Sequence, residues 1–163
     1  MILVRLAKPA EYPAVGDLTV QAYLADGGLP ANDPYYDLLR DADGRATDAE
    51  LWVAVDSDDE LLGTVTWCPP GSTYRELATD YEGEFRALAV ASQARGRGVG
   101  RILVERCLEL AVASGSDAVV ISTADWMAAA HHLYRTLQFV EAPERDWSPR
   151  PDIRLRAFVR ALP

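Results

Sequence analysis

A segment rich in glycine and arginine, residues 92–101, has the composition of a phosphate-binding loop. Gly96, Gly98 and Gly100 alternate there with arginine and valine, and glycine lets a phosphate approach the backbone because it has no Cβ. The apolar run before the segment predicts a strand, and the periodic run after it predicts a helix. Because the first N–H groups of a helix lack partners and carry partial positive charge, this junction predicts an anion site.

Three classes of ligand use a loop of this kind. A mononucleotide loop requires lysine and then serine or threonine after its last glycine, whereas Arg101 and Ile102 follow Gly100 here. A dinucleotide fingerprint requires Gly-x-Gly-x-x-Gly, and Arg101 stands where its third glycine would be. The sequence therefore argues against both nucleotide classes.

The third class matches this loop and a second motif. Arg95-x-x-Gly98-x-Gly100 resembles the pyrophosphate loop Arg/Gln-x-x-Gly-x-Gly/Ala of the GNAT family of N-acetyltransferases. Residues 130–139, Ala-His-His-Leu-Tyr-Arg-Thr-Leu-Gln-Phe, resemble that family's Ala-x-x-Leu-Tyr-x-x-x-Gly-Phe helix. The resemblance extends from about Glu84 to Phe139, and two motifs at this separation are more specific than one glycine-rich loop.

The resemblance implies that acetyl-CoA is the cosubstrate and that no metal takes part. It implies that loop amides hold the pyrophosphate, while a strand pairs with the pantetheine amides as it would with an extended peptide. An N–H near Leu88 or Val90 would then polarise the thioester carbonyl. The residues that this assigns to the coenzyme are Leu88, Ala89, Val90, Arg95, Gly96, Arg97, Gly98, Val99, Gly100 and Arg101.

Tyr134 matches the tyrosine that the family uses to protonate the leaving thiolate. A packing role is the competing interpretation, because Ala130, Leu133 and Leu137 share its neighbourhood at helical spacing. The motif favours the catalytic role.

Glu84 begins the strand that leads to Leu88. Family members often carry a glutamate at this place, which accepts a proton from the amine through water. An edge carboxylate in solvent is an equally good interpretation, and Glu82 is the neighbouring alternative for the base.

Two positions depart from the family pattern. Met127 stands seven residues before Tyr134, where the family commonly has an asparagine that contacts the coenzyme. Gln138 replaces the glycine before the phenylalanine, and a left-handed residue there costs about 1 kcal/mol more without glycine. We expect this helix end to close differently from a glycine end, and the contact of the family's asparagine to be missing or supplied by backbone.

The remaining reactive side chains are expected to be structural. His131 and His132 face different sides of a helix and have no metal-ligand spacing, so they are interpreted as surface or boundary residues. Cys107 lies among leucines and is expected in the core. Cys68 ends a predicted strand and could reach a cleft, but the sequence provides no base to activate it.

The predicted elements alternate in a way that defines the fold class. An antiparallel first half, including a hairpin, precedes a strand, a helix and a strand that imply a parallel pair. The class is mixed α/β, and the resemblance implies a GNAT-type sheet with a splayed central parallel strand pair. Expected strands are 2–7, 51–55, 61–67, 84–90, 118–123, 139–147 and 153–161, and expected helices are 9–25, 34–43, 99–114 and 127–137.

Length and composition narrow the function classes. A chain of 163 residues, 49% hydrophobic and 25% charged, suits one domain over residues 1–163. No stretch is long enough to span a membrane, and the apolar start is too short for a signal peptide, so a cytoplasmic location is the expectation. A net charge of −9 argues against nucleic-acid binding.

The negative charge is concentrated between Asp26 and Glu60, which holds eleven acidic residues and two arginines. A solvated surface is the simple interpretation. The segment also includes Asp33, Tyr35, Tyr36, Asp37 and Asp41, in the region that walls the acceptor side in the family. On that basis we expect a cationic amine to be favoured over an anionic acceptor.

The sequence therefore predicts an acetyl-CoA-dependent N-acetyltransferase that acts on a primary amine, by direct attack on the thioester. The acceptor is a small-molecule or peptide amine, and strands at the C-terminal end are compatible with a homodimer. The alternative is a non-catalytic acyl-CoA-binding domain with the same fold.

Overall fold

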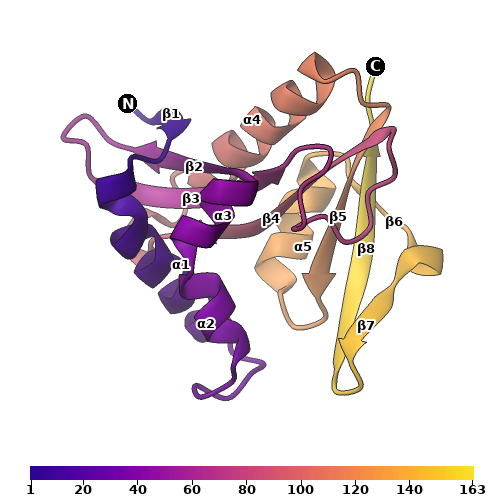
Figure 1. The fold of residues 1–163 in the computed structure, drawn as a ribbon, viewed down its shortest axis with the longest axis horizontal. Helices are drawn as coiled ribbons and strands as arrows, with labels where there is room; N and C mark the ends of the chain where they lie inside the picture. Colours follow the sequence, from indigo (N-terminus) through magenta and orange to yellow (C-terminus); the bar gives the residue numbers. More distant parts are fainter.

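The structure is a computed structural model that describes residues 1–163. Eight strands form one sheet in the order β1-β2-β3-β4-β5-β8-β6, with β7 also paired to β8 (Figure 1). The strands are β1 Leu3–Leu6, β2 Glu50–Val55, β3 Leu61–Cys68, β4 Glu82–Val90, β5 Ala118–Ala124, β6 Val140–Glu141, β7 Trp147–Arg150 and β8 Ile153–Ala161. The helices are α1 Tyr12–Asp26, α2 Tyr35–Arg40, α3 Ala42–Asp48, α4 Val99–Ala113 and α5 Ala128–Thr136.

Helices cover both faces of the sheet. Side chains along β2 alternate between the faces, because Leu51 and Val53 pack with α1 and α3 while Ala54 belongs to the cluster under α4. That larger cluster also contains Trp67, Phe85 and residues of α5. None of the helices combines the length and the apolarity needed to cross a membrane.

The parallel pair β4–β5 separates after a short stretch of pairing. Only Glu82–Glu84 of β4 pairs with Ala118–Val120 of β5, although β4 continues to Val90 and β5 to Ala124. Figure 1 shows the two strands diverging from this point, with β1–β4 on one side and β5–β8 on the other. The predicted mixed sheet with a splayed central parallel pair is confirmed.

Two predicted elements are divided in the structure. The predicted helix 34–43 is divided at Asp41, whose carboxylate accepts the N–H of Gly44 at 2.9 Å and begins α3 as an N-cap. The predicted strand 139–147 is divided between β6 at Val140–Glu141 and the start of β7 at Trp147, both paired to β8, because a short helical turn at Pro143–Arg145 interrupts it.

The end of α5 keeps the geometry that a glycine would give. Gln138 adopts a left-handed φ of 68°, and the N–H of Phe139 reaches back to the carbonyl of Tyr134 at 2.9 Å. The expected departure from the family at this helix end is therefore wrong. The non-glycine residue bears the cost of the left-handed conformation, about 1 kcal/mol.

Candidate functional site

The loop before α4 presents a row of free backbone donors. None of the N–H groups from Gly96 to Arg101 has a hydrogen-bond acceptor in the protein; the first helical bond of α4 runs from Ile102 to the carbonyl of Gly98 at 3.1 Å. The side chains of Arg95, Arg97 and Arg101 are exposed around these donors. The site therefore has the donors and the positive charge that bind phosphate oxygens.

The three glycines of the loop serve different purposes. Gly96 and Gly98 have φ values of 77° and 79°, a conformation that other residues rarely adopt. Gly100 lies inside α4, and a Cβ there would meet Leu133 at 3.2 Å and Val90 at 3.6 Å. Gly100 thus lets α4 pack closely on β4 and α5, whereas Gly96 and Gly98 shape the turn. Val99 is buried beneath the loop.

β4 offers an unpaired edge where it leaves β5. Its register against β3 shifts between Thr64 and Thr66, where the structure has a β-bulge on β4. The bulge includes Ala87, whose φ of 53° is left-handed, a conformation that costs a non-glycine residue on the order of 1 kcal/mol. Leu88, Ala89 and Val90 follow the bulge, beyond the last residue that pairs with β5.

A groove connects the end of β4 to the glycine-rich loop. Its volume is about 520 Å³, and Val90, Ser92, Gln93 and Arg95 form one wall. Residues of α1 form the opposite wall. The groove therefore runs from the end of β4 at Val90 to Arg95, the residue before the free N–H groups of the loop.

Tyr134 lies at the inner end of the splayed strands. Its ring is 6% exposed and packs against Phe85, Phe139 and Phe158. Burial raises the pKa of Tyr134 well above its usual value, so the phenol stays protonated. The Tyr134 side chain lines neither of the two cavities of the site.

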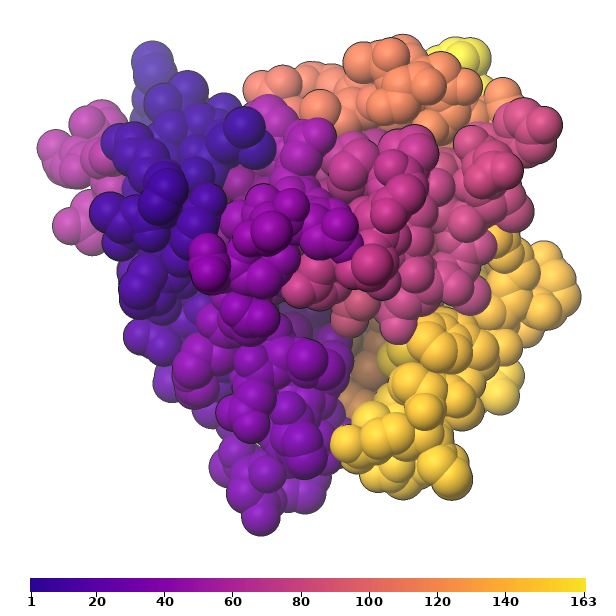
Figure 2. Space-filling model, viewed as in Figure 1, coloured from indigo at the N-terminus to yellow at the C-terminus, as the bar shows by residue number.

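A second cavity, the cleft, opens on the side of the sheet away from α4. Its volume is about 540 Å³, and its walls come from α1, α2, the loop after β3, the splayed ends of β4 and β5, and the β7–β8 hairpin. Figure 2 shows the surface hollowed between α2, this loop and the hairpin. Ala87 of the bulge lines the cleft, so the cleft and the free edge of β4 meet at the same point.

The structure gives Glu84 a different position from the one expected of a base. Glu84 is 1% exposed, and its carboxylate accepts the N–H groups of Glu76, Leu77 and Ala78 at 2.8–3.1 Å. It lines neither cavity. Its lone pairs are occupied by the loop after β3, so the role that it performs is to hold this loop in place.

Glu82 is also engaged elsewhere. Arg145 donates two hydrogen bonds to its carboxylate, at 2.7 and 2.9 Å. The hydrogen bond with Arg145 is the main cause that lowers the pKa of Glu82. The alternative base therefore stays ionised in a structural ion pair outside the cleft.

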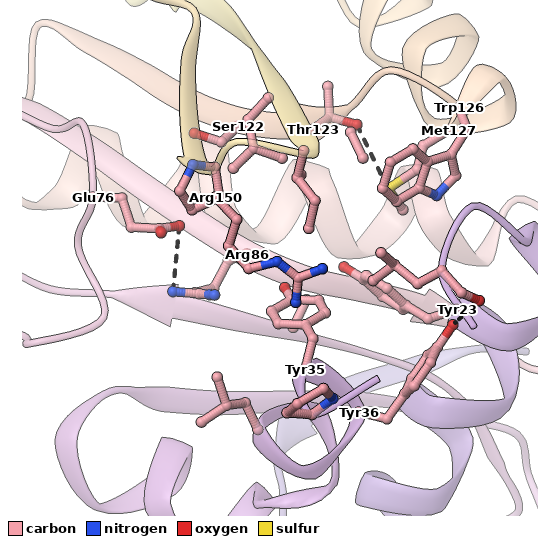
Figure 3. A pocket seen from close by; sticks show the side chains of 18 of the residues that line it. Tyr23, Tyr35, Tyr36, Glu76, Arg86, Ser122, Thr123, Trp126, Met127 and Arg150 are labelled. Atoms are coloured by element: carbon pink, nitrogen blue, oxygen red, sulfur yellow. Dashed lines mark hydrogen bonds and ion pairs between the residues drawn. The ribbon is translucent and has the colours of Figure 1, made fainter. Parts of the chain in front are cut away.

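A different carboxylate faces the cleft. Glu76 lies on the loop that Glu84 holds, and its carboxylate is 3.3 Å from the guanidinium of Arg86 on β4 (Figure 3). Both side chains are about three-quarters buried. Burial is the main cause that raises the pKa of Glu76, and Arg86 opposes it. Sequence reasoning missed both Glu76 and Arg86. No motif marks residues 72–83, which contain Glu76, and none marks Arg86 in the following strand.

The acidic segment does not give the cleft a negative wall. Arg150 of the β7–β8 hairpin donates to both carboxylate oxygens of Asp33, at 3.0 and 2.9 Å, so this charge is compensated. Tyr35 and Tyr36 line the cleft, but Asp37 and Asp41 are exposed outside it. The expected attraction of a cationic amine by Asp33 and Asp37 is therefore not supported by their positions.

The other reactive side chains have structural positions. His131 is buried, stacks on Phe158 and bonds the carbonyl of Ala124 at 3.0 Å, so the interpretation as a surface or boundary residue is wrong for it, while His132 is exposed. Cys107 is in the core, as predicted. Cys68 is fully buried rather than in a cleft, and burial raises the pKa of its thiol to about 12.

Comparison with known proteins identifies a curated relative. The chain is 35% identical over 110 residues to N-acetylaspartate synthetase from Homo sapiens, which covers 68% of this chain and 34% of that protein. The chain thus spans about a third of the length of that relative.

Solved structures agree over the whole chain. A GNAT-family acetyltransferase from Staphylococcus aureus Mu50 superposes with a TM-score of 0.78 at 14% identity, over 100% of both chains. The protein yncA from Salmonella typhimurium, solved with its cofactor acetyl-CoA, gives 0.69 at 19% identity, over 100% of this chain and 95% of the other. A sequence model of the acetyltransferase (GNAT) family matches residues 16–139. The chain therefore belongs to the acetyltransferase (GNAT) family.

Proposed function

We propose that residues 1–163 form one catalytic domain that transfers an acetyl group from acetyl-CoA to the primary amine of a small molecule or peptide, in the cytoplasm. The observation that carries the proposal is the row of free N–H groups from Gly96 to Arg101. It follows Arg95, which lines a groove that also includes Val90 at the end of β4. A relative with this fold was solved with acetyl-CoA as its cofactor.

In this proposal the coenzyme lies along β4 and ends at α4. The pyrophosphate oxygens accept hydrogen bonds from the N–H groups of Gly96 to Arg101, and Arg95 and Arg97 lie beside them. The pantetheine amides pair with Leu88, Ala89 and Val90 as an added strand would. The acetyl group then reaches the bulge at Ala87, where an N–H of Leu88 or Val90 polarises the thioester carbonyl.

The proposed reaction uses one acid and one base. Glu76 removes a proton from the acceptor ammonium, and the neutral amine attacks the thioester carbon. A C–N bond forms and the C–S bond breaks; Tyr134 gives its proton to the leaving thiolate, and the new amide nitrogen returns its second proton to the Tyr134 phenolate through water. Tyr134 suits this step because burial keeps its phenol protonated. Glu84 acts as a positioning residue, since it binds the loop that carries Glu76.

The test of this function is release of free thiol from acetyl-CoA in the presence of a panel of amines, with mass spectrometry of the products. We expect thiol release that requires both the protein and an amine, with an equal amount of N-acetylated product. Acetyl-CoA should also stabilise the fold, by about 2.7 kcal/mol at a hundredfold excess over its Kd. Stabilisation without thiol release for any amine would instead indicate a non-catalytic acyl-CoA-binding domain.

A further inference from the structure

Two opposite charges stand side by side where the acceptor must bind. Arg86 immediately precedes the bulge residue Ala87 on β4, and its guanidinium is 3.3 Å from the carboxylate of Glu76. Figure 3 shows both side chains in the wall of the cleft. A ligand that carries an ammonium group and a carboxylate on the same carbon offers one opposite charge to each of these two side chains.

The surroundings of Arg86 carry more positive than negative charge. Arg45 is 2% exposed and has no carboxylate partner; it donates to Thr66 Oγ1 at 3.0 Å and to the Leu39 carbonyl at 2.7 Å, and its Nε has no acceptor. Thr66 is the cross-strand neighbour of Arg86, so the two guanidinium groups lie close together. A buried positive charge without a counter-ion favours an anionic ligand group beside it.

A third arginine adds to this surplus. Arg75 donates to the carbonyls of Cys68 and Thr79, at 3.0 and 3.1 Å, and its second terminal nitrogen has no acceptor. Other charged groups that bond this loop are engaged: Asp48 accepts from Thr73, and Glu82 pairs with Arg145. Glu84 is occupied by backbone N–H groups. Glu76 is therefore the carboxylate that pairs with the guanidinium of Arg86.

The rest of the cleft is mostly apolar, with Ser122, Thr123 and Arg150 as its polar members; Arg150 is engaged by Asp33 and Asp152. Tyr23 and Tyr35 lie on the α1–α2 side with ring centroids 6.4 Å apart, and Leu38, Trp126 and Met127 contribute further apolar surface. This part of the cleft fits an aliphatic or aromatic side chain of the ligand better than a second charged group.

We propose that the acceptor is a free α-amino acid with an apolar or aromatic side chain, whose carboxylate binds Arg86 and whose ammonium binds Glu76. This proposal rests on the acetyl transfer proposed above and names its substrate class. With the carboxylate on Arg86, the α-nitrogen lies one carbon away, beside Ala87, where the thioester is expected. A carboxylate that lies several bonds farther from the amine would not place the nitrogen there.

The test compares acceptors that share one aromatic body: L-phenylalanine, L-phenylalaninamide and 2-phenylethylamine, with L-aspartate as the acidic comparison. We expect kcat/KM for phenylalanine to exceed that for each of the others by at least about tenfold. The amide is a demanding control because its less basic amine is more often neutral at pH 7 to 8 and would react faster without a carboxylate site. This comparison needs only the unmodified protein.

The matching variant is Arg86→Gln, with Arg40→Gln on the exposed face of α2 as a control of equal charge change. Arg86→Gln should lower kcat/KM for phenylalanine by about tenfold more than for 2-phenylethylamine, whose own loss measures the effect of the substitution on Glu76 alone. The control should change neither. Equal or faster acetylation of the amide, of 2-phenylethylamine or of aspartate by the unmodified protein would overturn the proposal, as would an equal loss for all acceptors in Arg86→Gln.

The outcome also separates this proposal from the one on which it depends. Thiol release with 2-phenylethylamine but not with phenylalanine would retain the acetyltransferase and reject the amino-acid acceptor. If acetyl-CoA binds but no amine, in this set or in a wider panel, gives thiol release, both the acetyl transfer and the amino-acid acceptor are rejected.

Discussion

Tyr134→Phe should lower kcat by about 10²-fold or more and leave the Kd for acetyl-CoA nearly unchanged. The substitution removes the proposed proton donor to the thiolate but keeps the ring that packs against Phe85, Phe139 and Phe158. Because burial raises the pKa of Tyr134, the phenol donates a proton across the neutral range. The wild-type rate should therefore fall only at a pH above the ordinary tyrosine pKa, and the variant should lack this alkaline fall.

Tyr81→Phe is the matched control. Tyr81 is 74% exposed, so the same chemical change there should alter neither kcat nor coenzyme binding. Steady-state kinetics and calorimetric titration with acetyl-CoA measure the two quantities separately. Unchanged turnover in Tyr134→Phe would reduce Tyr134 to a packing residue of the α5 cluster.

Glu76→Gln should lower kcat/KM by about 10²-fold at neutral pH, because the amine loses the base that removes its proton. The sign of the pH effect follows from its surroundings. Burial raises the pKa of Glu76 above the ordinary carboxyl value, and only the ionised form accepts a proton. The wild-type kcat/KM should therefore fall as the pH drops through this raised pKa, and Glu76→Gln should lose that acid limb.

Glu109→Gln provides the control for Glu76, since Glu109 lies on the exposed side of α4. It should retain both the rate and the acid limb. The pH profile is needed because Glu76→Gln also breaks the ion pair with Arg86, and a lost binding contact would lower the rate at every pH. An unaltered acid limb in Glu76→Gln would assign proton removal to water or to another group.

The elements of the proposed coenzyme side could be predicted from the sequence because their residues are contiguous. The loop from Arg95 to Arg101 and the helix around Tyr134 each form one local motif, and local patterns determine the turns, the helix starts and the buried faces. The same holds for the order of strands around the parallel pair. The splay of that pair was implied only by the family resemblance, since its structural correlate, the left-handed residue Ala87, is an alanine in an apolar run.

The acceptor side was not predictable in this way. Glu76 and Arg86 meet only because the loop after β3 turns back over the sheet, and a buried carboxylate on β4 holds this turn. Glu84 was interpreted as the base because its position in the strand matches the family. Its real environment depends on the path of residues 72–83, which have no periodicity from which a path could be predicted.

Charge patterns were similarly misleading at long range. Asp33 belongs to an acidic run in sequence, but Arg150, far along the chain, neutralises it in the fold. The two arginines that line the cleft, Arg86 and Arg150, come from β4 and β7, and neither lies in a basic segment of the sequence. The net charge of a segment therefore says little about the charge of the cleft that it borders.

Coenzyme binding at residues 96–101 is tested most directly by following the backbone amide resonances of ¹⁵N-labelled protein during titration with acetyl-CoA. We expect the amides from Gly96 to Arg101 to shift together, because each free N–H gains a phosphate or water-bridged acceptor, and Leu88 and Val90 to shift with them. NAD at the same concentrations should leave these resonances in place. Loop amides that stay unmoved while acetyl-CoA binds elsewhere, or that respond equally to NAD, would contradict coenzyme binding at this loop.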